Sequence, residues 1–163
     1  MSMITFDRGD ERFVYRAAAV IIENEKVLLG QAGRHTDFWF VPGGRVEMLE
    51  TSEESLKREM REELNEQVEI ERLLWIEERF FTFEGFKHHA IVMYYLTHLP
   101  PASPLRDQEA VYRFQDGGTP CLCKWHGLES LYEITCYPPF IREAIHRLPD
   151  SPRHIISRDE WGE

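Results

Sequence analysis

Three glutamates, Glu59, Glu62 and Glu63, lie three and four positions apart in a segment whose periodicity predicts a helix. This spacing places their carboxylates on one face near the end of the helix. Each like-charged pair costs about 0.2–0.5 kcal/mol, and the negative end of the helix dipole adds to the repulsion. A hard divalent cation, Mg²⁺ or Mn²⁺, would cancel the repulsion, because both ions prefer oxygen ligands. The alternative is a solvated charged face, which is the commonest environment of glutamate-rich helices, and spacing alone favours it.

Two capping signals bound this helix. Thr51 and Glu54 have the spacing of a capping box, so we expect the helix to begin near Ser52. It should end near Leu64, because the next residue, Asn65, adopts the left-handed backbone of a helix end more readily than most residues do. A different face carries the apolar stripe that should pack on the core, formed by Leu56, Met60 and Leu64.

Together with the loop before it, this segment resembles the Nudix box, G-x5-E-x7-R-E-U-x-E-E-x-G-U. The matching positions are Gly44, Glu50, Arg58, Glu59, Met60, Glu62 and Glu63. The chain then departs from the pattern, with Asn65 in place of a glycine and Glu66 in place of an apolar residue. Asparagine is the best substitute for glycine at a left-handed helix end, so the first departure affects the cap more than the chemistry.

The resemblance implies a role for each matching residue. Glu59, Glu62 and Glu63 would bind the metal, and the backbone carbonyl of Gly44 would help to coordinate it. The resemblance assigns the catalytic positions to Glu62, Glu59, Arg58 and Glu63. Glu62 is the candidate general base that removes a proton from the attacking water. Arg58 would orient the glutamates through charge-assisted hydrogen bonds, and Glu50 would anchor the loop, with Arg58 as its partner.

Two arginines outside the box are candidates for substrate phosphates. Arg16 interrupts the apolar segment 13–22, and Arg34 lies in the segment 33–37, which we expect to be an exposed loop. In many members of the resembled family, an arginine near the position of Arg16 contacts a phosphate group of the substrate. The alternative for Arg16 is an ion pair with an acid at a sheet edge. With Gly44, these residues form the expected substrate-binding set.

Other polar residues near the expected site have open roles. Some family members carry a His-Glu pair where this chain has His89-Ala90. Adjacent residues on a strand face opposite ways, so at most one of His88 and His89 can enter a given site. Glu109 lies in the segment 100–118, which is rich in proline and glycine and is expected to be a long loop. It is a candidate additional base, although a solvated loop charge is favoured.

The segments around the box predict a fold of alternating strands and helices. Strands are expected at 13–22 and 26–30, paired as a hairpin around 23–25, and at 38–41, 89–96 and 121–125. The segment 68–83 contains two apolar patches around the polar residues 77–79, a helical turn is expected at 128–131, and a final helix should open at 137–139 and run to 148. Two substantial helices imply an α/β sheet covered on both faces. The resemblance agrees and implies a Nudix-type α/β/α sandwich with a mixed β-sheet.

Length and composition predict a single domain. The 163 residues can bury a core, which the resemblance places at about 13–148, followed by a polar tail at 149–163. A net charge of −10 without a basic patch disfavours binding of a nucleic acid polymer. No apolar run is long enough to span a membrane. The odd number of cysteines (Cys121, Cys123 and Cys136) suits the cytoplasm, and buried thiols are favoured over a zinc site that would include His126.

The expected function is hydrolysis of a pyrophosphate linkage in a small nucleotide-type molecule, with Mg²⁺ or Mn²⁺ as cofactor. Substrates of this class are nucleoside triphosphates, ADP-ribose, dinucleoside polyphosphates and nucleotide sugars. The alternatives are a nucleotide-binding sensor without turnover and a different enzyme on the same fold, such as a prenyl diphosphate isomerase. The intact glutamates disfavour the sensor, and no residue can be placed for the isomerase. The resemblance leaves a homodimer open.

Overall fold

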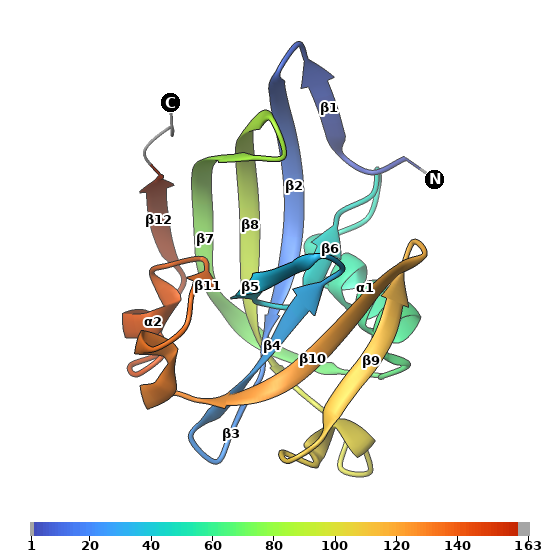
Figure 1. Ribbon diagram of the computed structural model, residues 1–163, viewed down its shortest axis with the longest axis vertical. Helices are drawn as coiled ribbons and strands as arrows, with labels where there is room; N and C mark the ends of the chain where they lie inside the picture. The colour runs from blue at the N-terminus through green and yellow to red at the C-terminus, as the bar shows by residue number, and fades with distance from the viewer. Residues whose placement is uncertain (1, 160–163) are drawn as a thin grey trace.

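The computed structural model describes residues 2–159, which form two mixed six-stranded sheets and one long helix (Figure 1). The first sheet has the order β1-β2-β8-β7-β12, and β6 pairs with part of β2. Its strands are β1 (Thr5–Arg8), β2 (Glu11–Val20), β6 (Gly43–Arg45), β7 (Glu69–Phe83), β8 (Phe86–His98) and β12 (Arg153–Arg158). The second sheet has the order β11-β5-β4-β10-β9, with β3 on β4. Its strands are β3 (Ile22–Glu23), β4 (Lys26–Ala32), β5 (His35–Phe40), β9 (Val111–Asp116), β10 (Thr119–Gly127) and β11 (Cys136–Tyr137).

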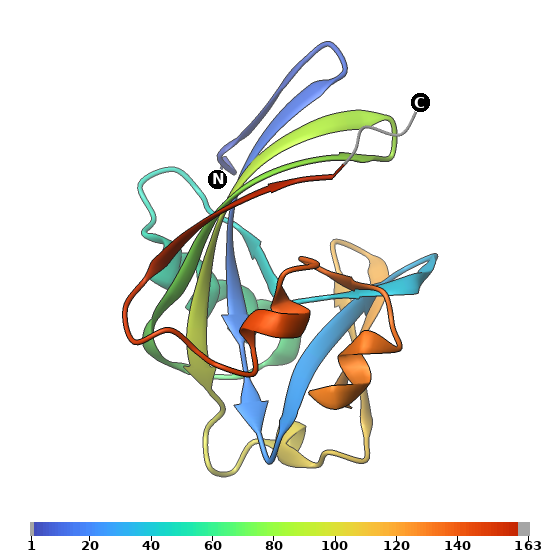
Figure 2. The ribbon, with the colours of Figure 1, turned by 90° about the vertical axis from the view of Figure 1, so that its left-hand side faces the viewer.

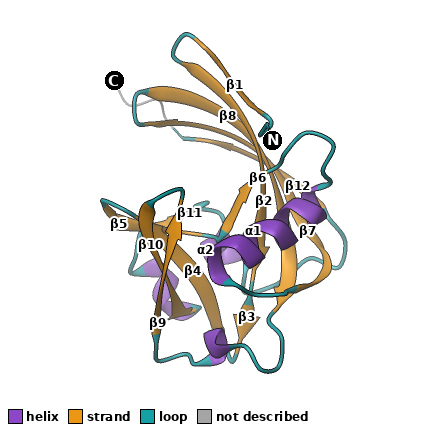
Figure 3. Cartoon of the chain, turned by 90° about the vertical axis from the view of Figure 1, so that its right-hand side faces the viewer, coloured by secondary structure: helices purple, strands orange, loops and turns teal. Residues whose placement is uncertain are grey.

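Two clusters of apolar side chains hold the layers together. Leu56 and Met60 of α1 (Ser52–Leu64) pack with Ala17 of β2 in one cluster. Val14 and Ala18, which point to the other side of β2, belong to the second cluster. The short helix α2 (Ile141–Ala144) also packs there, and two 3-10 turns, η1 (Pro104–Arg106) and η2 (Glu129–Tyr132), complete the helical segments. Figure 3 shows α1 lying across the first sheet, so the mixed sheets have helices on both sides, as the sequence predicted.

The sequence located most elements but not all of their partners. The predicted strand 13–22 is β2, which starts two residues earlier and pairs with β8 and β6 instead of folding back on β4. Only β3 forms the expected hairpin with β4. The chain crosses between the sheets next to Ile21, a fully buried residue, so a single apolar run serves both sheets. The strands expected at 38–41, 89–96 and 121–125 are parts of β5, β8 and β10.

Three predictions about local structure were wrong. Segment 33–37 is a loop only at its start, because β5 begins at His35. Segment 100–118 contains β9, whose Tyr112 and Phe114 pack against the core, so apolar alternation prevails over the prolines and glycines around it. The helix expected from 137 to 148 is only α2, because Tyr137 is held in β11 beside β5 and the residues after Ala144 form i→i+3 turns.

The polar residues 77–79 and the beginning of the polar C-terminal tail lie side by side in the first sheet. Within segment 68–83, the residues from Glu69 to Phe83 form the single strand β7, in which Glu77 and Arg79 are buried. The tail forms β12, which pairs with β7 in parallel, and Asp159 contacts the Arg79 guanidinium at 3.2 Å. Figure 2 shows that the upper parts of β1, β2, β7 and β8 extend beyond the second sheet. Among residues 2–159, no helix has the length and apolar content that crossing a membrane requires.

Candidate active site

The loop from β6 to α1 is built around close contact between backbone and carboxylate. A Cβ atom on Gly44 would lie 2.1 Å from the carboxyl carbon of Glu59. A Cβ on Gly43 would lie 2.0 Å from the carbonyl oxygen of Ala17 in β2. A side chain at position 43 would collide with backbone and is excluded, whereas a side chain at position 44 would displace the Glu59 carboxylate. This contact sets the first turn of the loop against the acidic face of α1.

Both predicted caps fix the helix in place. Thr51 accepts from the backbone N–H of Glu54, and the Glu54 carboxylate accepts from the backbone N–H of Thr51, which completes the capping box. Asn65 has φ 54° and ψ 37°, the left-handed conformation, and its N–H donates to the carbonyl of Arg61. Asparagine therefore does at position 65 what the family pattern assigns to glycine, and α1 begins and ends at the predicted residues.

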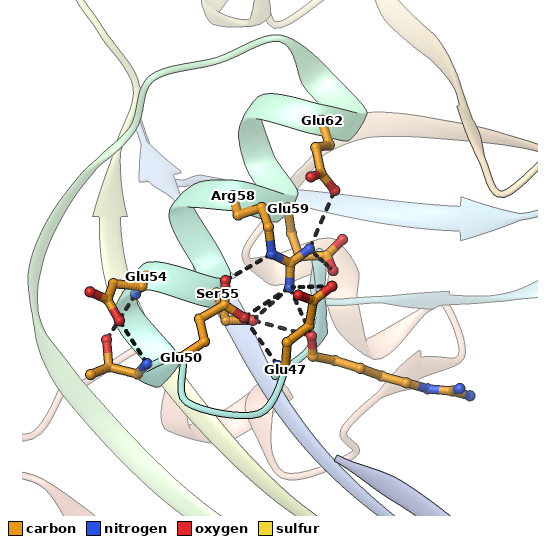
Figure 4. A network of polar contacts seen from close by, with 9 residues as sticks. Glu47, Glu50, Glu54, Ser55, Arg58, Glu59 and Glu62 are labelled. Carbon is orange, nitrogen blue, oxygen red and sulfur yellow. Dashed lines mark hydrogen bonds and ion pairs between the residues drawn. The ribbon is translucent and has the colours of Figure 1, made fainter. Parts of the chain in front are cut away.

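Arg58 is the centre of a charged network (Figure 4). Its Nε and Nη2 atoms donate to the two oxygens of Glu50 at 2.8 and 3.0 Å. Its Nη1 donates to Glu59 at 2.9 Å and to Glu62 at 3.3 Å. The Glu50 carboxylate also accepts a hydrogen bond from the backbone N–H of Glu47. Glu50 therefore holds the loop closed and, through Arg58, links the loop to the helix. The hydrogen bonds from Arg58 hold the pKa of Glu50 below its ordinary value. These contacts match the orienting and anchoring roles expected for Arg58 and Glu50.

Glu59 and Glu63 form the less exposed part of the acidic face. Glu59 is 7% exposed. Burial, a hydrogen bond shared with Glu59 and the negative charges of Glu59 and Asp116 raise the pKa of Glu63 well above its ordinary value. Glu62, by contrast, has a side chain that is 58% exposed. Two neighbouring carboxylates with no cation between them are a set of hard oxygen donors with surplus negative charge. This donor set fits a divalent cation.

The metal-binding geometry is not already assembled in the part of the chain that the structure describes. There, no group of three or more His, Cys, Asp or Glu side chains converges closely enough to hold a metal ion. Arg58 draws Glu62 and one oxygen of Glu59 toward itself, which accounts for the separation of Glu62 from Glu63. Coordination by all three glutamates and Gly44 stays a prediction, and it would require Glu62 to turn from Arg58 toward the other two.

The arginines predicted to bind substrate lie in different surroundings. Arg16 faces the same side of β2 as Val14 and Ala18, and its positive charge reaches Glu63. Arg34 donates to Glu84 at 2.6 Å and so links the β4–β5 turn to the β7–β8 turn. The structure thus brings Arg16 near the carboxylates, whereas Arg34 is engaged by another residue. Their contact with phosphate stays a prediction.

Histidines 88 and 89 point to opposite sides of β8, as expected for neighbours on a strand. His88 is buried and stacks on Phe81, and burial lowers its pKa. His89 is exposed and lies on the opposite side, against Phe80. The other candidate base, Glu109, is exposed and lies 3.5 Å from Lys26. The three cysteines are buried free thiols, as favoured from the sequence.

Two charged residues near the site were missed in the sequence. Asp116 ends β9 just before Gly117 and Gly118, so its sequence context indicates only a turn. Its charge acts on both Glu63 and Arg45. Arg45 occupies an unspecified position of the box, directly after Gly44, and burial together with nearby Arg16 lowers its pKa. The pairing of β6 with β2, which brings Arg45 to Arg16, is not visible in a one-dimensional pattern.

Comparison with known proteins identifies the class. The NUDIX domain family model matches residues 14–148. Diphosphoinositol polyphosphate phosphohydrolase 2 of Rattus norvegicus is 31% identical over 148 residues, covering 88% of this chain and 74% of that protein. An ADP-ribose pyrophosphatase of Streptococcus suis is similar in structure, with a TM-score of 0.58, 16% identity, and coverage of 88% of this chain and 98% of the other. A MutT Nudix hydrolase of Burkholderia pseudomallei is also similar in structure, with a TM-score of 0.58 and 23% identity. The match covers 81% of this chain and 96% of the other.

The fold and the carboxylate helix are thus those of a hydrolase that acts on pyrophosphate bonds. The chain belongs to the Nudix family, whose model spans most of its length.

Proposed function

We propose that the protein is a Mg²⁺- or Mn²⁺-dependent hydrolase of a small molecule in which a nucleoside diphosphate is joined to a second group. The observation that carries this proposal is the pair of neighbouring acids Glu59 and Glu63, of which Glu59 packs against Gly44. Such a pair is unfavourable without a cation, and a pyrophosphate linkage needs a cation to offset its own negative charge. Both requirements are met by one bound ion.

The residues of α1 have distinct roles in this proposal. Glu59 and Glu63, with Glu62 and the Gly44 carbonyl, would hold the cation, which neutralises phosphate charge and acidifies water when bound. Glu62 is exposed enough to meet a water molecule at the site and would take the proton from it as the general base. Arg58 holds Glu59 and the Glu50 loop in position. Arg16 would contact a phosphate, and Arg34 would do so only after leaving Glu84.

The reaction transfers a phosphoryl group to water. The water oxygen forms a bond to one phosphorus atom, the bridging P–O bond breaks, and the bridging oxygen leaves on the other phosphate. The products are a nucleoside monophosphate and a second phosphate-bearing fragment. Reduced thiols at all three cysteines favour a cytoplasmic setting. The exposed apolar residues Phe6 and Ile156, which lie on the two opposite edge strands of the first sheet, would be the first positions to test for a homodimer.

A substrate panel tests the proposal. The wild type would be incubated with dNTPs, ADP-ribose, dinucleoside polyphosphates, nucleotide sugars and a diphosphoinositol polyphosphate, with Mg²⁺ or Mn²⁺, and released phosphate groups would be measured. We expect turnover of at least one nucleotide and none in EDTA. Glu62→Gln should lower kcat by about 10²–10⁴-fold if Glu62 is the base. Glu53→Gln, on an exposed side of the same helix, is the matched control and should change little.

Three results would contradict parts of this account. Undiminished turnover by Glu62→Gln would remove the assignment of the base. Turnover of the inositol compound alone would replace the nucleotide as substrate. Tight nucleotide binding without hydrolysis under any condition would favour the alternative, a sensor on the same fold.

A further inference from the structure

A row of aromatic side chains crosses five strands of the first sheet. Phe6 of β1 is the direct partner of Phe13 of β2, and Phe13 is the partner of His89 of β8. His89 is in turn the partner of Phe80 of β7, and Arg158 of β12 ends the row beside Phe80. Directly opposed residues on neighbouring strands point to the same face of a sheet. These five side chains, which we call the aromatic row, therefore lie side by side on one face.

The aromatic row lies on the side of the sheet that carries α1, beyond the core on that side. Tyr15, two residues along β2 from Phe13, packs against the cluster formed with α1. Among residues 2–159, the three phenylalanines of the row belong to neither of the two apolar clusters. Figure 3 shows α1 crossing the sheet below the tips of β1 and β8. Phe6 is 64% exposed, and a groove of about 390 Å³ lies beside it over the row. Soluble monomers rarely leave such an apolar surface uncovered.

The charges around the aromatic row are balanced. Among the described residues, three cations and three acids surround it on this side of the sheet: Arg8, Lys87, Arg158, Asp10, Glu11 and Glu78. Lys87 lies 3.0 Å from Asp10, and Arg8 is the direct partner of Glu11. Because the patch has no excess of positive charge, it does not attract the phosphates of a nucleic acid or of a lipid surface. In a chain with a net charge of −10, it is a place where two copies can meet without repulsion.

The order of side chains in the row is complementary to itself. Consider a second copy packed face to face, related by a two-fold axis that runs parallel to the strands above β8. The row of the second copy then runs in the reverse order. Phe6 lies opposite Arg158 of the partner subunit, Phe13 lies opposite Phe80 of the partner subunit, and the two copies of His89 meet at the axis. A two-fold axis along the row would instead place Arg158 opposite its own copy, and like charges repel.

The neighbouring row of side chains fits the same arrangement. Ile4 and Ile156 lie two residues from Phe6 and Arg158, on the same face and at opposite edges of the sheet. The reversed order therefore places Ile156, which is 62% exposed, opposite Ile4 of the partner subunit. Five strands about 4.8 Å apart and three rows about 7 Å apart give roughly 500 Å² on each copy. The two copies together would bury about 1,000 Å², the lower limit for a specific interface.

We propose that this face is the interface of a homodimer, in which the aromatic rows of two copies pack against each other in reverse order. Aromatic side chains and arginine at the centre, with paired charges at the rim, are typical of protein interfaces. The small area makes the dimer reversible, so that it dissociates on dilution. The interface goes beyond the proposed function, because it contains no residue of the catalytic loop or of α1.

Sedimentation equilibrium of the full chain, over about 1 to 100 µM, tests the interface. We expect the average mass to rise with concentration from the 19.3 kDa of one chain toward twice that value. Phe6→Lys should weaken the dimer by at least about 10-fold, because it removes a central aromatic contact twice in each dimer. Tyr132→Lys is the matched control, because Tyr132 is an aromatic residue of similar exposure, 56%, in η2. Its dimerisation should equal that of the wild type.

A second substitution tests the reversed order of the rows. In the wild type, Arg158→Glu should weaken the dimer, because it removes a guanidinium from the ring of Phe6 in the partner subunit. In the Phe6→Lys background, Arg158→Glu should strengthen the dimer instead, because it replaces a repulsive pair with an attractive one. Positions 6 and 158 lie on opposite edge strands of one copy, so a change of sign requires contact between copies.

Three results would overturn the interface. They are a wild type that stays monomeric throughout the concentration range, a Phe6→Lys variant that dimerises as tightly as Tyr132→Lys, and an Arg158→Glu effect of the same sign in both backgrounds. The melting temperature of dilute Phe6→Lys checks its fold, and Ile156→Lys takes its place if it does not fold. Glu62→Gln should dimerise like the wild type, whether or not the protein hydrolyses a nucleotide. The interface and the proposed function therefore fail separately.

Discussion

At the scale of single residues, the contact between Glu59 and Glu63 lowers the stability of the folded protein when both carboxylates are charged, although the proposed function requires both charges. Burial and the neighbouring acids raise the pKa of Glu63. The folded state therefore holds the Glu63 proton more tightly than the unfolded chain does. The stability that Glu63 contributes is present in full below the ordinary carboxyl value near 4.5 and is lost as the pH rises through the raised folded-state pKa. A bound cation would remove this loss by replacing the proton.

We predict that Glu63→Gln raises the melting temperature in EDTA and lowers activity. The gain in melting temperature over the wild type should be larger at pH 9 than at pH 5, because only the wild type must ionise this buried carboxyl. Activity with Mg²⁺ should fall by at least about 10-fold, since even partners of metal ligands contribute that much. Glu53→Gln is again the control. Equal stability of Glu63→Gln and wild type at pH 9 would contradict the assignment of a strained carboxylate pair.

Residue spacing predicted the acidic face but not how its members are held. Positions 59, 62 and 63 do share one side of α1, yet Arg58 binds two of the three carboxylates. Glu63 is also less exposed than Glu62. Asp116 and Arg45 come from strands β9 and β6, and only tertiary pairing brings them near. A motif describes residues that are close in sequence, so contributors from other strands are invisible to it.

At the scale of elements, α1 depends on the left-handed residue that ends it. Asn65→Gly should change the free energy of unfolding by no more than about 1 kcal/mol, because glycine adopts the same conformation and loses only some backbone entropy. Asn65→Val should lose about 1–2 kcal/mol, because a β-branched residue is strained at φ 54°. Urea unfolding of both variants measures the difference. Equal losses would show that the cap geometry is unimportant.

Helices and turns whose ends are marked by particular residue types could be predicted from the sequence. Elements that form because of pairing with a distant strand could not. The two caps of α1 follow from residue type, and both occur as expected. Strand β9 was hidden because its apolar alternation is short and flanked by glycine and proline. The predicted final helix failed for the opposite reason: its proline start is a valid local signal, but pairing of β11 with β5 overrides it.

At the scale of the whole molecule, the C-terminal strand completes the first sheet beyond the region that the family model matches. It covers the edge of β7, where Glu77 is fully buried and Arg79 is 7% exposed. We predict that truncation after Leu148 lowers the melting temperature, because it exposes this edge and removes Asp159 from Arg79. Asp159→Asn should cause a smaller decrease. An unchanged melting temperature after truncation would contradict this role for β12.

The whole account depends on cation binding by the acidic end of α1, and anomalous diffraction measures it most directly. Crystals would be grown with Mn²⁺ and imidodiphosphate, a pyrophosphate analogue with a nitrogen bridge. We predict an anomalous peak between Glu59 and Glu63, beside Gly44, with the analogue bound against it. A well-ordered acidic cluster that faces solvent and has no peak, in crystals that contain both components, would contradict the central claim.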